Sequence, residues 1–167
     1  MEASQVREIF DYDPLTGVLR WKIQVSRHKI GDVAGLKKAP KGRKRYMFIR
    51  YEGKWYLAHR LAFAIMEGRW PDPEVDHENT DGWDNRWLNL REATKAQNAQ
   101  NRKMPITNKV GMKGVIRVAR FGVTKFEARI RVSGKQKHLG RFDTAQEAHA
   151  AYCNAADKHF GDFARTH

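Results

Sequence analysis

Residues 74–90 read EVDHENTDGWDNRWLNL and make up the densest polar cluster of the chain. Asp76 and His77 are neighbours within it, and Asn98 follows in a segment with a helix signal. Hydrolysis of a phosphodiester needs a base for the attacking water, a cation on the phosphate, and a group that fixes the tautomer of the base. In a strand, Asp76 and His77 point to opposite faces and need not compete for one metal ion. The stretch therefore permits a hydrolytic site.

The plainer interpretation of residues 74–90 is a polar loop, because Asn and Asp close turns with their own backbone. If a metal site is present instead, oxygen donors from Asp and Asn suit a hard cation such as Mg²⁺ or Mn²⁺. The single cysteine, Cys153, excludes a Cys-rich zinc site and a disulfide framework within one chain. Composition alone leaves the loop and the metal site as alternatives.

The chain resembles the HNH endonuclease family of phages and mobile introns. The resemblance begins near Phe10-Asp11-Tyr12-Asp13-Pro14 and covers about the first 105 residues. Its motifs follow one another in the order and spacing of the family: His59-Arg60-Leu61, Val75-Asp76-His77, Asp84-Asn85-Arg86, Asn89-Leu90-Arg91 and Asn98.

The resemblance implies a role for each of these polar residues. Asp76 and Asn98 would ligate one divalent ion per site, Mg²⁺ with Mn²⁺ as the alternative, in a strand-strand-helix metal motif over about residues 74–102. His77 would be the general base, and Asn89 would hold its ring, with Asn85 as a competitor for that task. We expect His59 to be structural. The implied enzyme is a site-selective, homing-type endonuclease that nicks duplex DNA as a monomer.

The charge of the chain also favours a polyanionic partner. The net charge is +13 and the pI about 10.1, and both parts are cationic: residues 1–107 hold 20 Lys and Arg against 14 Asp and Glu, and residues 108–167 hold 12 against 5. The alternative is that the lysines serve solubility alone. A basic run over residues 37–45 fits binding to backbone phosphates without sequence preference, through Lys41, Arg43, Lys44 and Arg45.

Local patterns predict an α+β protein of two domains, with a boundary near residue 107 after the helix that carries Asn98. The first domain, residues 1–107, has helix signals over 3–10, 59–67 and 94–102, a strand at 18–23, and a hairpin of 46–51 with 55–58. The second domain, residues 108–167, has strands at about 114–119, 125–132 and 136–142, then a helix over 145–158 that Thr144 and Glu147 begin as a capping box.

The second domain presents one apolar and one cationic sheet face. In residues 125–132, Lys125, Glu127, Arg129 and Arg131 alternate with apolar residues, and a sheet can read base edges in the major groove. Almost all of residues 112–165 resembles the plant ethylene-response-factor (APETALA-type) DNA-binding domain. The motifs are Lys113-Gly114-Val115, Lys125-Phe126-Glu127-Ala128-Arg129-Ile130, His138-Leu139-Gly140-Arg141-Phe142-Asp143-Thr144, Glu147-Ala148, Ala151-Tyr152 and Phe160-Gly161.

This resemblance implies a DNA-facing side of a three-stranded antiparallel sheet packed on one helix, with Arg120, Arg129, Arg131, Gln136 and His138 on that side. Ile116 and Val118 stand where plant members place base-reading arginines, so a GC-rich target does not follow. The alternative for these arginines is a solvated outer face.

We therefore predict a metal-dependent endonuclease that acts on double-stranded DNA. Without a signal-peptide core or a run of about 20 apolar residues, we expect it in the cytoplasm and away from membranes. Two rivals stay open: a non-catalytic DNA-binding regulator that retains a nuclease scaffold, and an RNA-directed protein.

Overall fold

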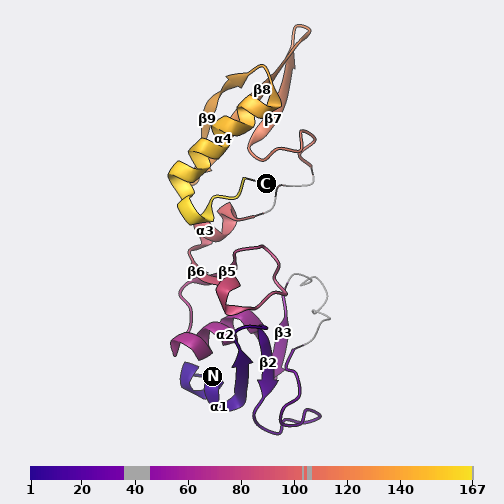
Figure 1. Cartoon of the computed structure of the whole chain (residues 1–167), viewed down its shortest axis with the longest axis vertical. Coiled ribbons are helices and arrows are strands. Elements are labelled where there is room, and N and C mark those ends of the chain that lie inside the picture. Colours follow the sequence, from indigo (N-terminus) through magenta and orange to yellow (C-terminus); the bar gives the residue numbers. More distant parts are fainter. Residues whose placement is uncertain (36–45, 103, 105–106, 167) are drawn as a thin grey trace. The chain divides into compact units, whose positions relative to one another are not determined.

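The structure is a computed structural model that describes residues 1–35, 46–102, 104 and 107–166. The chain divides into two compact units, Met1–Lys95 and Ala96–His167. Both combine helices with small antiparallel sheets, which confirms the α+β class (Figure 1). The predicted boundary near residue 107 lies beyond this division, and the basic residues Lys41, Arg43, Lys44 and Arg45 lie outside the described residues.

The described part of the first unit is built on three two-stranded antiparallel sheets, β1–β2, β3–β4 and β5–β6. Helix α1 precedes the first sheet, and helix α2 follows the second. The elements are α1 (Ala3–Ile9), β1 (Phe10–Asp13), β2 (Val18–Trp21), β3 (Phe48–Tyr51), β4 (Lys54–Leu57), α2 (Ala58–Glu67), β5 (Glu74–His77), the 3₁₀ turn η1 (Trp87–Asn89) and β6 (Leu90–Ala93).

One apolar cluster holds this unit together. Val6 of α1, Leu61 of α2 and Leu19 of β2 are fully buried, and the ring centroids of Phe10 and Trp21 lie 4.7 Å apart. Helix α2 ends where Gly68 adopts a left-handed conformation and donates its N–H to the carbonyl of Ala64. The helices predicted over residues 3–10 and 59–67 and the hairpin of residues 46–58 are thus confirmed.

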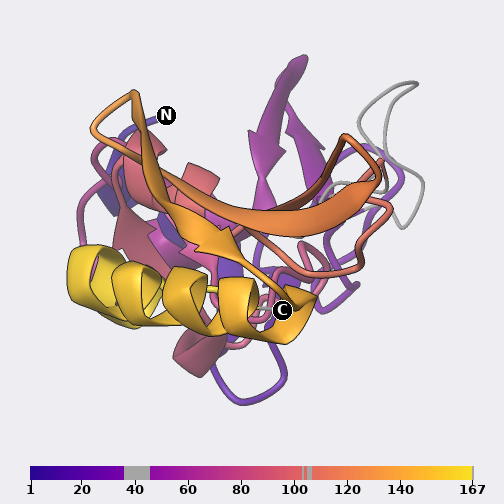
Figure 2. The ribbon, with the colours of Figure 1, turned by 90° about the horizontal axis from the view of Figure 1, so that it is seen from above.

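The second unit contains a three-stranded antiparallel sheet in the order β7–β8–β9, and α4 lies along one face of it (Figure 2). The helix begins with the predicted capping box, since Thr144 Oγ1 accepts the N–H of Glu147 and a Glu147 oxygen accepts the N–H of Thr144. The elements of the second unit are α3 (Lys95–Gln100), β7 (Val115–Arg120), β8 (Val123–Val132), β9 (Lys135–Phe142), α4 (Ala145–Phe160) and η2 (Gly161–Phe163).

Small residues of α4 allow close packing on the sheet. Ala148 packs with Val115 and Ala128, while Tyr152 and Ala156 pack with Ile130. The predicted sheet packed on one helix is therefore present. Helix α3 ends at Gln100, two residues before the predicted Arg102. No helix within the described ranges is long and apolar enough to cross a membrane.

Candidate active site

The β5–β6 hairpin of the first unit presents Asp76 and His77. The register pairs Asp76 with Arg91 and His77 with Leu90, so the two side chains point to opposite faces of this small sheet, as the strand prediction required. Both are buried, with exposed fractions of 5% for Asp76 and 4% for His77. A strand therefore holds a carboxylate and an imidazole in fixed and different environments.

Asp76 pairs with the arginine directly opposite it in the sheet. Arg91 donates to Asp76 Oδ2 from Nε at 3.1 Å and from Nη2 at 3.0 Å. The ion pair offsets part of the cost of burying a carboxylate. Carboxylate oxygens are also ligands that hard cations prefer.

His77 is packed between aromatic rings. The ring of His59 lies 4.8 Å away and is nearly perpendicular to it, at 83°, and the ring of Tyr46 lies 5.7 Å away. Burial lowers the pKa of His77 from its usual 6.5, although the Asn85 hydrogen bond and nearby carboxylates act in the opposite direction. At neutral pH the imidazole is therefore uncharged and able to accept a proton.

Asn85 determines which nitrogen of His77 carries the proton. Asn85 Oδ1 lies 3.2 Å from His77 Nε2, and Asn85 Nδ2 donates to the carbonyl of Trp83 at 3.4 Å. Because the Asn85 amide donates to Trp83, its oxygen faces the imidazole and accepts the Nε2–H. In this neutral tautomer the lone pair of the ring is on Nδ1.

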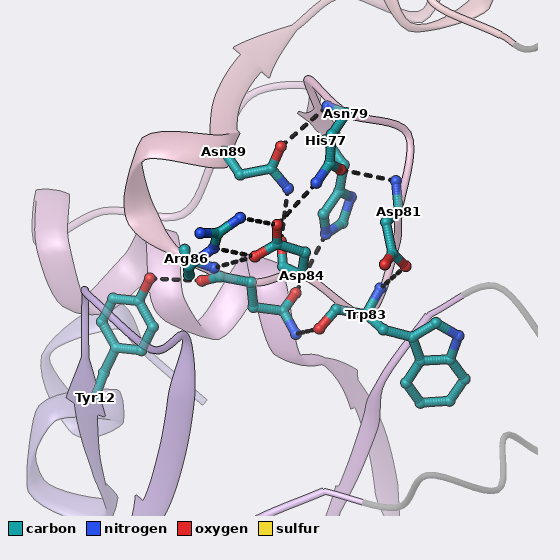
Figure 3. Close-up of polar contacts among 9 residues, drawn as sticks. Tyr12, His77, Asn79, Asp81, Trp83, Asp84, Arg86 and Asn89 are labelled. Atoms are coloured by element: carbon teal, nitrogen blue, oxygen red, sulfur yellow. Dashed lines mark hydrogen bonds and ion pairs between the residues drawn. The ribbon is translucent and has the colours of Figure 1, made fainter.

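Asn89 uses its side chain to close the loop between β5 and β6. Its Oδ1 accepts the N–H of Asn79 at 3.0 Å, and its Nδ2 donates to the carbonyl of Asp84 at 2.7 Å (Figure 3). The hydrogen bond to the His77 ring that we expected from Asn89 thus comes from Asn85. Local spacing alone could not distinguish the two asparagines, and a direct role of Asn89 in catalysis stays a prediction.

Asp84 is a second anchor of this loop. It accepts from Arg86 Nη2 at 2.6 Å and from Asn79 Nδ2 at 2.7 Å. These contacts, with Arg86 contributing most, lower the pKa of Asp84 to about 2. The Asp84 carboxylate therefore stabilises the loop. The loop interpretation and the site interpretation of residues 74–90 are thus compatible, because turn-closing residues surround the imidazole.

The β1–β2 turn braces the same loop from a distant part of the sequence. The Tyr12 hydroxyl donates to the Asn85 carbonyl at 2.7 Å, and the N–H of Trp87 donates to the Pro14 carbonyl at 2.9 Å. Gly17 has a φ of 73°, and a Cβ there would lie 2.5 Å from the Arg86 nitrogen. Only glycine fits this close approach, so the turn holds Asn85 in place.

His59 is buried and its ring contacts that of His77, so its structural role stays a prediction. It is 4% exposed, and its Nδ1 has no hydrogen-bond partner in the part of the chain that the structure describes. Burial, reinforced by His77 and Arg60, holds the pKa of His59 well below 6.5. The folded protein therefore keeps this imidazole neutral.

We predict a pH-dependent stability of the first unit from His59. Below pH 6.5 the unfolded chain binds a proton that the folded chain excludes, so the free energy of unfolding decreases as the pH falls, by up to about 1.4 kcal/mol per pH unit for one histidine. His59→Leu should reduce this slope, leaving the smaller contribution of His77. Urea unfolding at several pH values, followed by tryptophan fluorescence, measures it, since all 5 tryptophans lie in the first unit. An unchanged slope would contradict the assignment.

Asn98 lies on α3, which belongs to the second unit. The pairing of Asn98 with Asp76 as metal ligands stays a prediction. Among the described residues, no group of three or more His, Cys, Asp or Glu is arranged to hold a metal. The predicted ligand set needs only one carboxylate and one amide oxygen, and both are the hard donors that Mg²⁺ and Mn²⁺ prefer.

The predicted DNA-facing residues lie on the β7–β8–β9 sheet. Arg120, Arg131, Gln136 and His138 are exposed, while Arg129 is half-buried. Lys125 forms an ion pair with Asp143. Their contact with DNA stays a prediction.

Glu127, which the alternation of residues 125–132 places on the cationic face of the sheet, holds two arginines of that face. Glu127 is buried and accepts from Arg129 Nη2 at 2.6 Å and from Arg141 Nη2 at 2.7 Å. These two arginines lower the pKa of Glu127 to about 2, so it stays ionised. Arg129 and Arg141 are thus held side by side by one anion.

A family comparison addresses part of the chain. Residues 56–100 match a family model described as HNH endonuclease, in the middle of the chain and not from its N-terminus. Searches of curated proteins and of solved structures gave no match. The resemblance of residues 112–165 to the ethylene-response-factor domain lies outside the matched segment and stays a prediction. The segment that carries Asp76, His77, Asn85 and Asn89 is similar to HNH endonucleases, and this similarity supports nuclease activity on DNA.

Proposed function

We propose that this protein is a metal-dependent endonuclease that hydrolyses phosphodiester bonds in duplex DNA, as a site-selective nicking enzyme of the homing type. The observation that carries the proposal is His77: a buried, neutral imidazole with its Nε2 at Asn85, next to Asp76, within the segment similar to HNH endonucleases. Structural histidines are also often buried, but the adjacent carboxylate and the family match favour the catalytic role.

His77 acts as the general base of the proposed reaction. Asn85 accepts the Nε2–H, so Nδ1 takes a proton from the attacking water. The positive charge that then develops on the ring is stabilised by the carboxylates of Asp76, Asp81 and Asp84, which favour the protonated form. A base with a pKa below its usual value is ready to accept a proton at neutral pH, and nearby anions limit the cost of doing so.

Asp76 and Asn98 would hold the divalent ion. When bound, such an ion stabilises negative charge on the phosphate and on the leaving oxygen. Arg91 orients the Asp76 carboxylate before any ion binds. With one such site in each chain, a monomer would cut a single strand.

Binding to DNA would rest on the cationic residues of both parts of the chain. Arg120, Lys125, Arg129, Arg131, Gln136 and His138 would contact DNA from the sheet, and Lys41, Arg43, Lys44 and Arg45 would bind backbone phosphates. Phosphate contacts supply affinity that falls steeply with salt, while base contacts supply sequence preference.

Nicking of supercoiled plasmid with and without Mg²⁺ tests the proposal. We expect the wild-type protein to convert supercoiled plasmid to the open-circular form only with the divalent ion. Binding without cleavage under all ionic conditions would favour the rival regulator. Competition by RNA and by duplex DNA at matched salt separates an RNA-directed protein, since a basic field attracts both polymers.

We predict different effects of substituting the two asparagines. Asn85→Ala removes the acceptor that fixes the His77 tautomer, so we expect the nicking rate of the folded protein to drop by about 10- to 100-fold. Asn85→Asp keeps an acceptor and should retain more activity. Asn89→Ala opens the loop at two hydrogen bonds and should lower stability, by about 1 to 3 kcal/mol, together with activity. Equal activity in Asn85→Ala and wild type would contradict the positioning role.

A further inference from the structure

The hairpin of β7 and β8 ends in an exposed aromatic residue. Arg120 pairs with Val123, so only Phe121 and Gly122 form the turn, and both have positive φ, 51° and 78°. Such two-residue turns favour Asn and Gly at these positions. A phenylalanine in the left-handed region is strained. The fold therefore holds a bulky ring where a smaller residue would be more stable.

The ring of Phe121 packs against none of the described residues. Its exposed fraction is 102%, and Val123 next to it is 56% exposed. An aromatic side chain of this kind removes about 150–250 Å² from water when it is buried. Backbone strain that no packing among residues 1–35, 46–102, 104 and 107–166 offsets indicates a contact outside the chain.

The surroundings of the ring favour a polyanion as that contact. Residues 115–126 contain Arg117, Arg120 and Lys125 and no Asp or Glu. Arg117 and Arg120 are exposed, and Arg131 adds another exposed cation farther along β8. The apex is thus an apolar tip bordered by positive charge at the end of a two-stranded ribbon (Figure 1).

We propose that Phe121 is a wedge that inserts between base pairs of duplex DNA from the minor groove, while the arginines beside it bind the flanking phosphates. Apolar side chains inserted in this way unstack one base step and kink the duplex. Duplex DNA as the partner rests on the proposed function; the wedge itself rests on the exposure, backbone and charge of the apex. The wedge contributes affinity and bends the DNA with little dependence on sequence.

The test is the change in linking number that full-length protein produces in a plasmid. With the protein bound, a metal-independent type I topoisomerase relaxes the plasmid in EDTA, and the plasmid is then freed of protein. Unstacking unwinds DNA, so the wild-type protein should shift the topoisomer distribution. Phe121→Asn should reduce this shift to near background and weaken duplex binding by about tenfold or more. Phe121→Leu, which keeps an apolar tip, should retain most of both effects.

Two controls keep the test independent of folding and of catalysis. Asn tolerates positive φ, so Phe121→Asn should unfold at a higher temperature than wild type, and reduced DNA unwinding cannot then be attributed to misfolding. Val123→Asn, at the matched exposed apolar position, should unwind DNA like wild type. Failure of Mg²⁺-dependent nicking would refute the proposed catalysis and leave the EDTA experiment unaffected.

Three results would overturn the wedge: an equal linking-number shift for wild type and Phe121→Asn, no shift with wild type, or no binding to duplex at all. Binding to vesicles of phosphatidylcholine and phosphatidylserine tests a lipid surface as the partner of Phe121. Sedimentation of the free protein tests self-association. A Phe121 dependence found only with vesicles, or only in self-association, would also overturn it.

Discussion

His77→Ala is expected to slow plasmid nicking by about 10²- to 10⁴-fold, the usual contribution of a positioned base. The reason is the geometry of the ring: Asn85 accepts from Nε2, and His59 and Tyr46 confine the ring, so its Nδ1 is held in a fixed position. The measurement is the single-turnover rate of nicking at saturating Mg²⁺, which isolates the chemical step.

Alanine also leaves a cavity, so the experiment needs a shape-conserving partner. His77→Gln fills more of the space and can still donate to Asn85, but an amide does not act as a base near neutral pH. It should be as slow as His77→Ala and more stable. His28→Ala, an exposed histidine of the same unit that stacks on Trp21, should nick at the wild-type rate. Normal nicking by both His77 variants would show that another group activates the water.

Asp76→Asn is expected to lower Mg²⁺-dependent nicking by about 10³-fold or more, because a ligated ion supplies several kcal/mol of transition-state stabilisation. Asparagine is the informative replacement. Alanine would leave the half-buried Arg91 guanidinium without this carboxylate, whereas the amide oxygen can still accept from Arg91. Mn²⁺ binding followed by electron paramagnetic resonance gives a readout that does not depend on cleavage.

Glu92→Gln is the matched control for Asp76→Asn. Glu92 lies on β6 of the same small sheet and also pairs with an arginine, Arg69, at 2.7 Å. Its substitution should leave both Mn²⁺ affinity and nicking close to wild type. Wild-type nicking in EDTA, or wild-type Mn²⁺ affinity in Asp76→Asn, would refute the assignment of Asp76 as a metal ligand.

The elements of the fold were largely predictable from the sequence because their signals are local. Thr144 and Glu147 begin a helix through contacts three residues apart, and apolar residues spaced one helical turn apart define α2 and α4. The opposite orientation of Asp76 and His77 was predictable for the same reason, because any strand places neighbouring residues on opposite faces.

Tertiary contacts decided the arrangement around His77. Asn85, and not Asn89, reaches the imidazole, because Tyr12 and the turn at Gly17 hold the backbone of Asn85 from across 73 residues of sequence. His59 and Tyr46 approach the same ring only after α2 and β3 have packed. Likewise, Glu127 holds Arg141 only because β8 and β9 pair in one register.

The amino-acid sequence by itself therefore determined the element types, the α+β class, the strongly basic charge, and which residues could carry hydrolytic chemistry. The tertiary structure decided which asparagine fixes the imidazole, how deeply that imidazole is buried, and that Phe121 is exposed on a strained turn. The physical reason is the distance along the sequence over which each kind of interaction acts. Backbone propensity and periodicity act over a few residues, whereas burial, pKa and hydrogen-bond partners depend on segments that meet only when the chain has folded.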